Sequence, residues 1–592
     1  MVYNPFLFSE PVIVETIKQQ LNQLVSQALG SVAGLSNCNA NVITASRPEF
    51  GDYQANGIMA IAKELETNPR ELAAKVVTAL EAINAPLVSA FDIAGPGFIN
   101  IHLNTKGLCE RANLIQQRTA PLVTKIDEPA TIVIDYSSPN LAKEMHVGHL
   151  RGTIIGDCLA RVLEKIGHRI IRQNHVGDWG TQFGMLIAFL EESSIDASDL
   201  STQLADLETF YRAAKQKFDS DPSFAERARQ CVVKLQNGDA VYLSIWKQFI
   251  EESLAHCETI YDKLKITLSR SDLCAESFYN KELENIVNEL YNKSLLSISD
   301  RAKCVFLPEF TGKDGDPLPT IIQKSDGGYL YATTDLAAIR YRSQELHADR
   351  TLYVVDARQS LHFQQVFAVA REAGFVGSSV SLEHITYGTM MGLDGKPFKT
   401  RSGDLVKLIE LLDEAVKRAF ALVTAKNPQL DEALRLKIAE RMGIAAIKYA
   451  ELSKNRTSDY IFEWSSMLSF DGNTAPYLMY AYARIRSILK KQSVTNDNFC
   501  ITLLPSKEER ALLIKALQLP ETVEAVAADC FPNQLCNYLY ELAGLFMRFY
   551  EACPILKAEG ETHQSRLALA ALTAEALAQG LDLLGIEPLE QM

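Results

Sequence analysis

Residues 131–156 read TIVIDYSSPNLAKEMHVGHLRGTIIG, and this stretch decides the fold of the chain. It begins with a β-branched, largely apolar run at 131–134, which is typical of a buried parallel strand. Residues 137–140 break that strand, and from Val147 onward apolar residues recur every three or four positions up to Ile166. The pattern predicts a strand, a loop and then a helix that packs a broad apolar face on a sheet.

The predicted helix begins with a His-Val-Gly-His turn that suits a bound anion. His146 and His149 lie in the first turn, where free backbone N–H groups and the positive end of the helix dipole favour negative charge. Gly148 has no side chain, so a flat ring such as adenine can approach the backbone closely. Lys143, just upstream, adds a flexible cation. The turn is therefore a candidate polyphosphate site.

Two simpler interpretations of this turn are open on the residues alone. The histidines can be ordinary helix-start residues with surface partners, or they can be half of a metal site. A zinc site calls for a third ligand and often has a glutamate between the histidines, and neither stands beside them. We therefore expect no protein-bound metal, and the strand, loop and helix around the turn favour phosphate binding.

Two neighbouring segments carry a resemblance to a known family. Residues 137–157, SSPNLAKEMHVGHLRGTIIGD, and residues 174–184, NHVGDWGTQFG, closely resemble arginyl-tRNA synthetases. The turn at 146–149 matches the HIGH signature of class I aminoacyl-tRNA synthetases, and the resemblance spans nearly the whole chain. It implies an enzyme that uses ATP, accompanied by Mg²⁺, to activate L-arginine and transfers it to the terminal adenosine of tRNA(Arg). It also implies no bound zinc and an activation step that requires tRNA.

The same resemblance implies a multidomain fold with α/β and all-α parts. A Rossmann-like class I synthetase catalytic domain would lie between an N-terminal α+β additional domain and a C-terminal helical anticodon-binding bundle. The hydropathy pattern agrees, because strand–helix alternation fills the middle of the chain and helical stripes fill its end. The expected boundaries are 1–110 for the N-terminal tRNA-binding domain, 127–402 for the catalytic domain with a helical insertion at about 185–319, 405–465 for a helical connecting region and 466–592 for the anticodon-binding domain.

Composition limits the class of protein. The 592 residues are 47% apolar and 22% charged, as in an ordinary soluble protein of several domains. No uninterrupted apolar stretch of about 18 residues occurs and no basic region precedes the short apolar N-terminus, so we expect a cytoplasmic protein without a membrane segment. The 11 cysteines are scattered without a C-x-x-C motif, which argues against a disulfide framework or a zinc ribbon.

The net charge of −14 argues against indiscriminate binding to nucleic acid, since phosphate contacts need local Lys and Arg. A tRNA-binding protein of this composition must rely on local basic patches. Two segments offer such patches, although runs of this kind are more often plain solvated helix faces. The candidates are Lys448, Lys454 and Arg456 in one segment, and Arg484, Arg486, Lys490 and Lys491 in the other.

A second phosphate-binding loop is expected after the last strand of the sheet. Residues 386–404 read TYGTMMGLDGKPFKTRSGD, in which KPFKT at 396–400 keeps the spacing of the class I KMSKS signature. Its glycines would let the loop close over a triphosphate; an ordinary exposed turn is the alternative. By resemblance, the catalytic candidates are His146, His149, Lys399, Lys396 and Lys143. The ATP-binding candidates are His146, Gly148, His149, Lys396 and Lys399.

Selectivity for arginine calls for carboxylates, because bidentate, charge-assisted hydrogen bonds hold a planar guanidinium best. Asp135 ends the first strand, and Asp335 follows a turn at 326–328 between two strand-like runs, so we expect both carboxylates at strand ends. By resemblance, the arginine contacts are Asp135, Asn140, His146, Tyr331, Asp335 and Gln359. A loop cap for Asp135, a helix N-cap for Asp335 and a surface position for Gln359 are the alternatives.

The resemblance also implies tRNA contacts at both ends of the chain. One set, in a loop of the N-terminal domain, would stack on or hydrogen-bond to bases at the D-loop corner, and local packing is its alternative. The other set, mostly on one helix of the last domain, would meet unstacked anticodon bases, although aromatics at helical spacing are more often core residues. The first set is Phe50, Tyr53, Gln54 and Asn56, and the second is Tyr477, Tyr480, Arg484 and Met592.

Two other functions are consistent with the sequence. A class I synthetase for another amino acid, such as glutamine or cysteine, would share the fold, although the chain lacks zinc-ligand cysteines for the latter. A non-catalytic tRNA-binding paralogue would keep the fold without the reaction. Both phosphate-binding elements are intact, which argues against the paralogue. We expect the working unit to be a monomer.

Overall fold

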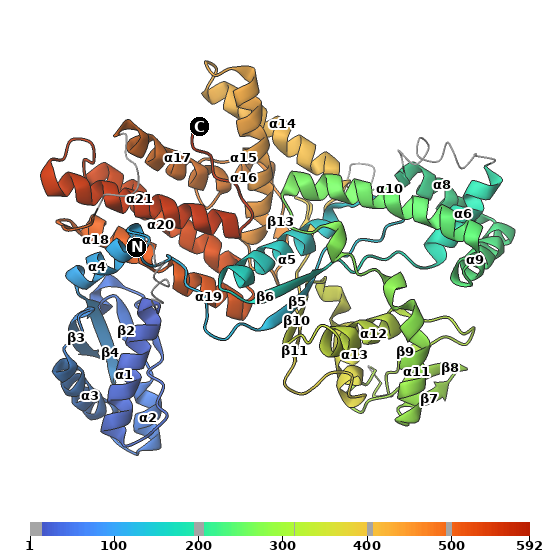
Figure 1. The fold of residues 1–592 in the computed structure, drawn as a ribbon, viewed down its shortest axis with the longest axis horizontal. Helices are drawn as coiled ribbons and strands as arrows, with labels where there is room; N and C mark the ends of the chain where they lie inside the picture. The colour runs from blue at the N-terminus through green and yellow to red at the C-terminus, as the bar shows by residue number, and fades with distance from the viewer. Residues whose placement is uncertain (1–14, 194–206, 313, 400–405, 493–499) are drawn as a thin grey trace, which may run out of the picture.

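The computed structural model describes residues 15–193, 207–312, 314–399, 406–492 and 500–592 (Figure 1). A small N-terminal domain, a sheet-containing middle part and a helical C-terminal part follow each other along the chain. This order confirms the predicted fold class. In the part of the chain that is described, no helix is long and apolar enough to cross a membrane.

The N-terminal domain is a four-stranded antiparallel sheet covered by helices. Thr16 begins the first helix, because its side chain accepts from the backbone of Gln19 while the Gln19 side chain accepts from the backbone of Thr16. The strands run in the order β1-β2-β4-β3. The elements are α1 Ile17–Ala33, β1 Val42–Thr44, β2 Tyr53–Ala55, α2 Ile58–Glu64, α3 Pro69–Ile83, β3 Val88–Ala94, β4 Phe98–Leu103 and α4 Thr105–Gln116.

The middle part of the chain is built on a parallel sheet with the order β11-β10-β5-β6. Strand β5 (Thr131–Asp135), helix α5 (Val147–Lys165) and strand β6 (Arg169–Gln173) form the predicted strand–loop–helix unit and its return. Much later in the chain, β10 (Arg350–Tyr353) and β11 (Ser381–His384) extend the sheet on the other side of β5. The strand order reverses at β5, so the crevice beyond the carboxyl ends of β5 and β10 is the expected ligand site.

Helix α5 connects the sheet to the C-terminal helices. A Cβ at Gly156 would lie 2.3 Å from the Cβ of Tyr136, so only glycine lets the helix approach the strand end this closely. Arg151 on α5 forms a buried ion pair of 2.9 Å with Glu451, a residue of the C-terminal part. Because both charges are shielded from water, this pair fixes the two parts against each other.

The predicted helical insertion is helical only in its first part. Its last part contains two strands that the sequence did not reveal, β7 and β8, which form a three-stranded antiparallel sheet with β9. These strands are short and mix polar with apolar residues, so they lack the alternation that marks a longer strand. The elements are α6 Thr181–Glu192, α8 Leu207–Ser220, α9 Pro222–Gln236, α10 Ala240–Leu264, α11 Leu283–Asn292, β7 Leu296–Ser299, β8 Ala302–Val305 and β9 Thr320–Gln323.

The turn at 326–328 is confirmed, but one of the two strand-like runs beside it is a helix. Gly327 adopts φ +86°, and the strand before the turn is β9. After the turn the chain enters α12, Tyr331–Gln344, whose interior residues are buried against the sheet domain. The β10 strand is followed by α13, Ser360–Glu372, as the pattern predicted.

The C-terminal part is a bundle of helices, shown from yellow to red in Figure 1. The helical stripes predicted for the end of the chain are confirmed. The prediction of a basic surface patch at 448–456 is wrong, because the side chains of Lys448 and Arg456 are buried, with 1% and 8% of their surface exposed. The helices are α14 Leu408–Lys426, α15 Glu432–Leu452, α16 Trp464–Met467, α17 Ala475–Lys491, α18 Lys507–Leu517, α19 Leu519–Asp529, α20 Asn533–Ala552 and α21 Gly560–Leu583.

The N-terminal domain contacts the C-terminal helices. Arg510 on α18 donates two hydrogen bonds to the carboxylate of Asp52, at 2.9 and 2.7 Å. The hydroxyl of Tyr53 donates to Glu521 on α19 at 2.7 Å. In Figure 1 the N-terminal domain accordingly lies against the C-terminal helices and away from the insertion.

Candidate active site

The first turn of α5 presents two imidazole N–H groups. Nδ1 of His146 accepts from the backbone N–H of Gly148 at 3.0 Å, and Nδ1 of His149 accepts from the backbone N–H of His146 at 3.2 Å. The two ring centroids are 4.1 Å apart. A neutral imidazole that accepts at Nδ1 carries its proton on Nε2. Both rings therefore offer Nε2–H donors to a ligand.

Both rings are neutral at pH 7. Burial, followed by the neighbouring imidazole of His146, lowers the pKa of His149 to about 3. Burial and then the charge of Lys143 also lower the pKa of His146 below its usual value. The turn can therefore bind phosphate oxygens through hydrogen bonds and the helix dipole, while the positive charge must come from elsewhere.

Gly148 has a role inside the turn itself. A Cβ at this position would lie 2.8 Å from Cε1 and 2.9 Å from Nδ1 of His146. The sequence suggested that this glycine leaves room for a flat ligand ring. The geometry gives it a nearer reason, because the glycine makes room for the imidazole that caps the helix.

The KPFKT loop is a tight, exposed turn at the edge of the C-terminal part. It follows β12, Met390–Met391, which pairs with β13, Tyr460–Ile461. The N–H of Gly392 donates to the carbonyl of Lys396 at 2.7 Å, and the ring of Phe398 lies 4.9 Å from that of Phe462. The side chains of Lys396 and Lys399 are exposed. The loop thus has a fixed base and two free-standing cations.

Backbone pairing brings the chain from this loop to the start of α5. Val147 N–H donates to the carbonyl of Val406 at 3.1 Å, and Leu408 N–H donates to the carbonyl of Met145 at 2.9 Å. Lys407 lies opposite His146 in this antiparallel bridge. Residues 400–405, which include Gly403 of the predicted loop, lie outside the described residues. The described chain that resumes after the KPFKT loop therefore pairs directly with the residues that begin α5.

The loop after β5 is held by the second resembling segment. Asn140 is exposed and pairs with Gly177, where a Cβ would lie 2.1 Å from Oδ1 of Asn140. The N–H of Leu141 donates to the carbonyl of Gly177 at 3.0 Å. The glycine in NHVGDWG thus allows the two loops to touch at the mouth of the crevice.

Asp135 does not face the crevice as an open carboxylate. It is 6% exposed, forms an ion pair of 2.7 Å with Arg342 of α12, and accepts from the Ser138 hydroxyl at 2.8 Å. Burial alone would raise the pKa of Asp135, but Arg342 and the hydrogen bonds hold it below its usual value. The structure therefore contradicts the expected contact with arginine, because this carboxylate already holds a guanidinium of the protein.

Asp335 lies inside α12, so the expectation that it stands at the end of a strand is wrong. The alternative that it caps the helix is also wrong, because Leu330 is the N-cap residue. Oδ2 of Asp335 lies 2.6 Å from Nε2 of His362 on α13. Tyr331, one turn earlier on the same helix, is 63% exposed. The helix thus presents a carboxylate and a phenol on neighbouring turns.

A further carboxylate belongs to this group and was missed in the sequence. Burial, followed by repulsion from Asp178 and then Asp335, raises the pKa of Glu276 to about 8. Glu276 also raises the pKa of Tyr331, after burial, so it lies near that phenol. No periodicity or motif marks Glu276 along the chain. These carboxylates come together only in the folded chain. Among the described residues, no group of three or more His, Cys, Asp or Glu side chains could hold a metal.

The other two candidates lie at the rim. Gln359 is exposed in the short turn before α13, next to Asp356, which caps the turn. Lys143 is exposed and its Nζ lies 4.6 Å above the ring of Tyr211 in the insertion. Both side chains are free to meet a ligand over the crevice without breaking an ion pair of the described structure.

The predicted tRNA contacts of the N-terminal domain are only partly available. Tyr53 is fully buried and bonded to Glu521, so the expectation that it stacks on a base is wrong. Gln54 is half-buried and donates to Asn100 at 2.7 Å. Phe50 and Asn56 are half-buried and keep a part of their surface exposed.

In the C-terminal domain the predicted residues form part of a larger aromatic cluster. The guanidinium of Arg484 lies 5.2 Å from the ring centre of Tyr480 on α17 and 4.8 Å from that of Tyr550 on α20. The rings of Tyr477 and Tyr540 are 5.6 Å apart. The contribution of α20 could not be read from the sequence, because it depends on which helices pack together. Met592 is half-buried and packs against the main core.

Comparison with known families covers nearly the whole chain. Residues 111–464 match the family "tRNA synthetases class I (R), catalytic domain". Residues 15–103 match "Arginyl tRNA synthetase N terminal domain", and residues 478–592 match "DALR anticodon binding domain". The chain belongs to the arginyl-tRNA synthetase family.

Individual relatives agree with this membership of the arginyl-tRNA synthetase family. The arginine–tRNA ligase of Laribacter hongkongensis is 55% identical over 98% of this chain and 100% of its own length. That of Chromobacterium violaceum is 54% identical with the same coverage. The crystal structure of the Plasmodium falciparum arginyl-tRNA synthetase has a TM-score of 0.82 and 29% identity, covering 98% of this chain and all of its own. The Thermus thermophilus enzyme has the same fold, with a TM-score of 0.82 at 24% identity over 97% of this chain and all of its own.

Proposed function

We propose that this chain activates L-arginine with ATP and transfers the arginyl group to tRNA(Arg). The observation that carries the proposal is the backbone bridge between residues 145–147 and 406–408. It joins the chain that follows the KPFKT loop to an imidazole-lined helix N-terminus, beyond the carboxyl ends of a parallel sheet whose strand order reverses there. Such an arrangement suits a triphosphate that must be held while pyrophosphate leaves.

The ATP site would combine hydrogen-bond donors and separate cations. The Nε2–H groups of His146 and His149 would donate to phosphate oxygens, and the start of α5 around Gly148 would add backbone donors. Lys399 would neutralise the leaving pyrophosphate, with Lys396 and Lys143 in support. ATP would enter as its Mg²⁺ complex, which the chain would not hold through ligands of its own.

The arginine pocket would be formed mainly by α12 and the segment that precedes α11. Asp335 and Glu276 would hold the guanidinium, and the hydroxyl of Tyr331 would complete the contact. Asn140 and Gln359, both exposed at the rim, would meet the amino and carboxylate groups together with His146. Asp135 would act indirectly, since it fixes the helix that carries Asp335 and Tyr331.

The tRNA would be held by the two ends of the chain. The aromatic cluster around Arg484, with Tyr477 and Tyr480, would stack on unpaired anticodon bases. Phe50 and Asn56 offer the remaining contacts of the N-terminal loop, and Met592 would lie near the anticodon side. We propose that the enzyme works as a monomer, because all the proposed site residues come from one chain. We also place it in the cytoplasm, as the composition of its sequence led us to expect.

The experiment that tests the function is charging of bulk tRNA by the purified protein with ATP and each labelled amino acid in turn. Charging with arginine alone is the expected result. Charging with another amino acid would discard the proposed pocket. Binding of tRNA without charging by any amino acid would favour a non-catalytic paralogue.

A further inference from the structure

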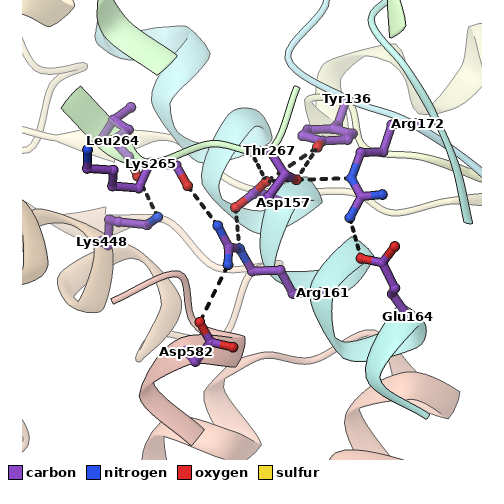
Figure 2. Close-up of polar contacts among 10 residues, drawn as sticks. All are labelled: Tyr136, Asp157, Arg161, Glu164, Arg172, Leu264, Lys265, Thr267, Lys448 and Asp582. Atoms are coloured by element: carbon purple, nitrogen blue, oxygen red, sulfur yellow. Dashed lines mark hydrogen bonds and ion pairs between the residues drawn. The ribbon is translucent and has the colours of Figure 1, made fainter. Parts of the chain in front are cut away.

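A cluster of charged and polar groups lies behind the site, where α5, α10, α15 and α21 meet (Figure 2). None of its side chains is among the ligand contacts proposed above, and the proposed reaction gives it no task. Several of its members are buried, although buried charges are costly unless they hold something in place. Its side chains are Tyr136, Asp157, Arg161, Glu164, Arg172, Thr267, Lys448 and Asp582.

Two of its cations hold the C-terminal end of α10. Nζ of Lys448 donates to the carbonyl of Leu264 at 2.7 Å, and Nη2 of Arg161 donates to the carbonyl of Lys265 at 2.8 Å. These are the carbonyls that the end of a helix leaves without partners, and they carry the negative end of its dipole. Lys265 itself ends the helix in the left-handed conformation, with φ +54°.

Asp157 keeps these cations in place. It is 1% exposed, accepts from Nε of Arg161 and from the backbone N–H of Thr267, at 2.8 and 2.7 Å, and its charge acts on Lys448. Burial lowers the pKa of Lys448 to about 8, and Asp157 opposes this effect, so the lysine is mainly protonated at pH 7. The segment that leaves α10 is thus tied to α15 at Leu264 and to α5 at Lys265 and Thr267.

The C-terminal end of α21, the last helix, lies next to the same two cations, Arg161 and Lys448. Asp582 of α21 lies 3.8 Å from Nη1 of Arg161. A Cβ at Gly585, which has φ +66°, would lie 2.4 Å from Nζ of Lys448 and 3.3 Å from Nε of Arg161. The end of α21 therefore lies close against both cations, and a side chain at Gly585 would collide with Lys448.

One turn before its end, α10 reaches the active-site loop. The hydroxyl of Tyr261 lies 2.7 Å from Oγ of Ser137 and accepts from Nδ2 of Asn174 at 3.0 Å. The hydroxyl of Thr153 contacts Oγ of Ser137 at 2.9 Å and donates to the carbonyl of His149 at 2.8 Å. Polar contacts on either side of the last turn of α10 therefore connect α21 to the first turn of α5.

We propose that Arg161 is a positioning residue that links the seating of α21 to the placement of the His146–His149 turn, through the end of α10 and the hydroxyl of Tyr261. The proposal rests on the proposed role of that turn in binding ATP. It assigns the cluster a task in setting the turnover of the enzyme, because the imidazole donors act only when they stand where the phosphate charge develops.

The test is a double-mutant cycle of Arg161→Gln and Tyr261→Phe in the full-length protein, with Arg441→Gln as a matched control. Arg441 also connects α15 to the C-terminal segment, through an ion pair of 3.1 Å with Glu587, and within the described ranges its ion pair does not involve α10. Each single variant of the link should lower kcat for arginylation about three- to thirtyfold with little change in the KM for arginine. The double variant should lose no more than the worse single one, because both break one link.

Hydrogen exchange of the peptide that covers 137–153 gives a readout that does not need activity. We expect faster exchange in both link variants and unchanged exchange in Arg441→Gln. Multiplicative losses in the double variant, or the same loss in Arg441→Gln, would overturn the link. An inactive wild-type protein would refute the proposed function instead, and the exchange of residues 137–153 would still decide whether the link exists.

Discussion

Asp135 at the end of β5 and Arg342 in α12 form an ion pair of 2.7 Å in which the two residues are 6% and 1% exposed. Nε of Arg342 also donates to Gln173 at the end of β6. The pair therefore joins two strand ends to the helix that carries Tyr331 and Asp335. Asp135, which the sequence suggested for substrate binding, thus binds Arg342 of the protein. Through this pair it positions the helix that carries Asp335, the carboxylate proposed to bind the substrate.

Asp135→Asn should destabilise the protein more than it changes the affinity for arginine. The substitution leaves the buried charge of Arg342 unpaired, and breaking a buried pair on one side costs about 3–5 kcal/mol. A lower midpoint of thermal unfolding, measured by circular dichroism, is the expected result. A variant with unchanged unfolding and a large rise in the KM for arginine would show that Asp135 binds substrate after all.

Asp335→Ala should give the opposite pattern. Its carboxylate is half-buried and contacts His362 at 2.6 Å, so its loss disturbs little of the fold. Losing a charge-assisted contact to the guanidinium should raise the KM for arginine about 10- to 100-fold. Steady-state kinetics at saturating tRNA and ATP measure the change. His362→Ala is the matched control, and it should raise the KM less, because it removes a neighbour of the carboxylate and keeps the carboxylate itself.

Much of the fold could be predicted because it depends on local patterns. The β5–loop–α5 unit, the strand β10 and five C-terminal helices have long, regular apolar stripes. The short strands β7 and β8 and the helical state of 331–344 could not be predicted in this way. The α12 helix is buried on most sides, so its sequence lacks the amphipathic period that usually marks a helix.

The candidate site divides in the same manner. The phosphate-binding turn was visible because its residues are consecutive and stand at a helix start. Glu276 was invisible because its neighbours Asp178 and Asp335 are distant in sequence and meet only in the fold. Tyr53 was misread because an aromatic in a polar loop looks exposed, whereas its hydroxyl is bound to Glu521 of another domain.

His149→Ala should lower turnover about 100- to 1,000-fold, the usual cost of losing one preorganised donor to developing charge. His149→Gln should retain more activity, since its amide can still donate near the Nε2 position. The pKa of about 3 further predicts that this ring causes no change in activity between pH 6 and 8. Filter binding should find the affinity for tRNA nearly unchanged. An equal loss of tRNA binding would contradict the assignment to catalysis.

Arginine binding should release a proton from Glu276. With a pKa of about 8, this group is mainly protonated at pH 7, whereas a guanidinium binds the carboxylate form. The pKa must therefore fall in the complex, and the affinity for arginine should rise as the pH increases from 6.5 to 8. Calorimetric titrations in two buffers with different ionisation enthalpies measure the released proton. Glu276→Gln is the control, and proton release that persists in this variant would exclude Glu276 as its source.

Arg484→Ala should weaken tRNA binding without slowing the activation of arginine. The guanidinium lies 5.2 and 4.8 Å from the ring centres of Tyr480 and Tyr550, and a stacked base contributes about 1–3 kcal/mol. We therefore expect a loss of about tenfold in tRNA affinity, with kcat at saturating tRNA unchanged. Arg486→Ala is the matched control on the same helix, because Arg486 is paired with Glu590 at 3.3 Å. An equal loss in both variants would mean that the helix contributes general positive charge and that the aromatic cluster does not read a base.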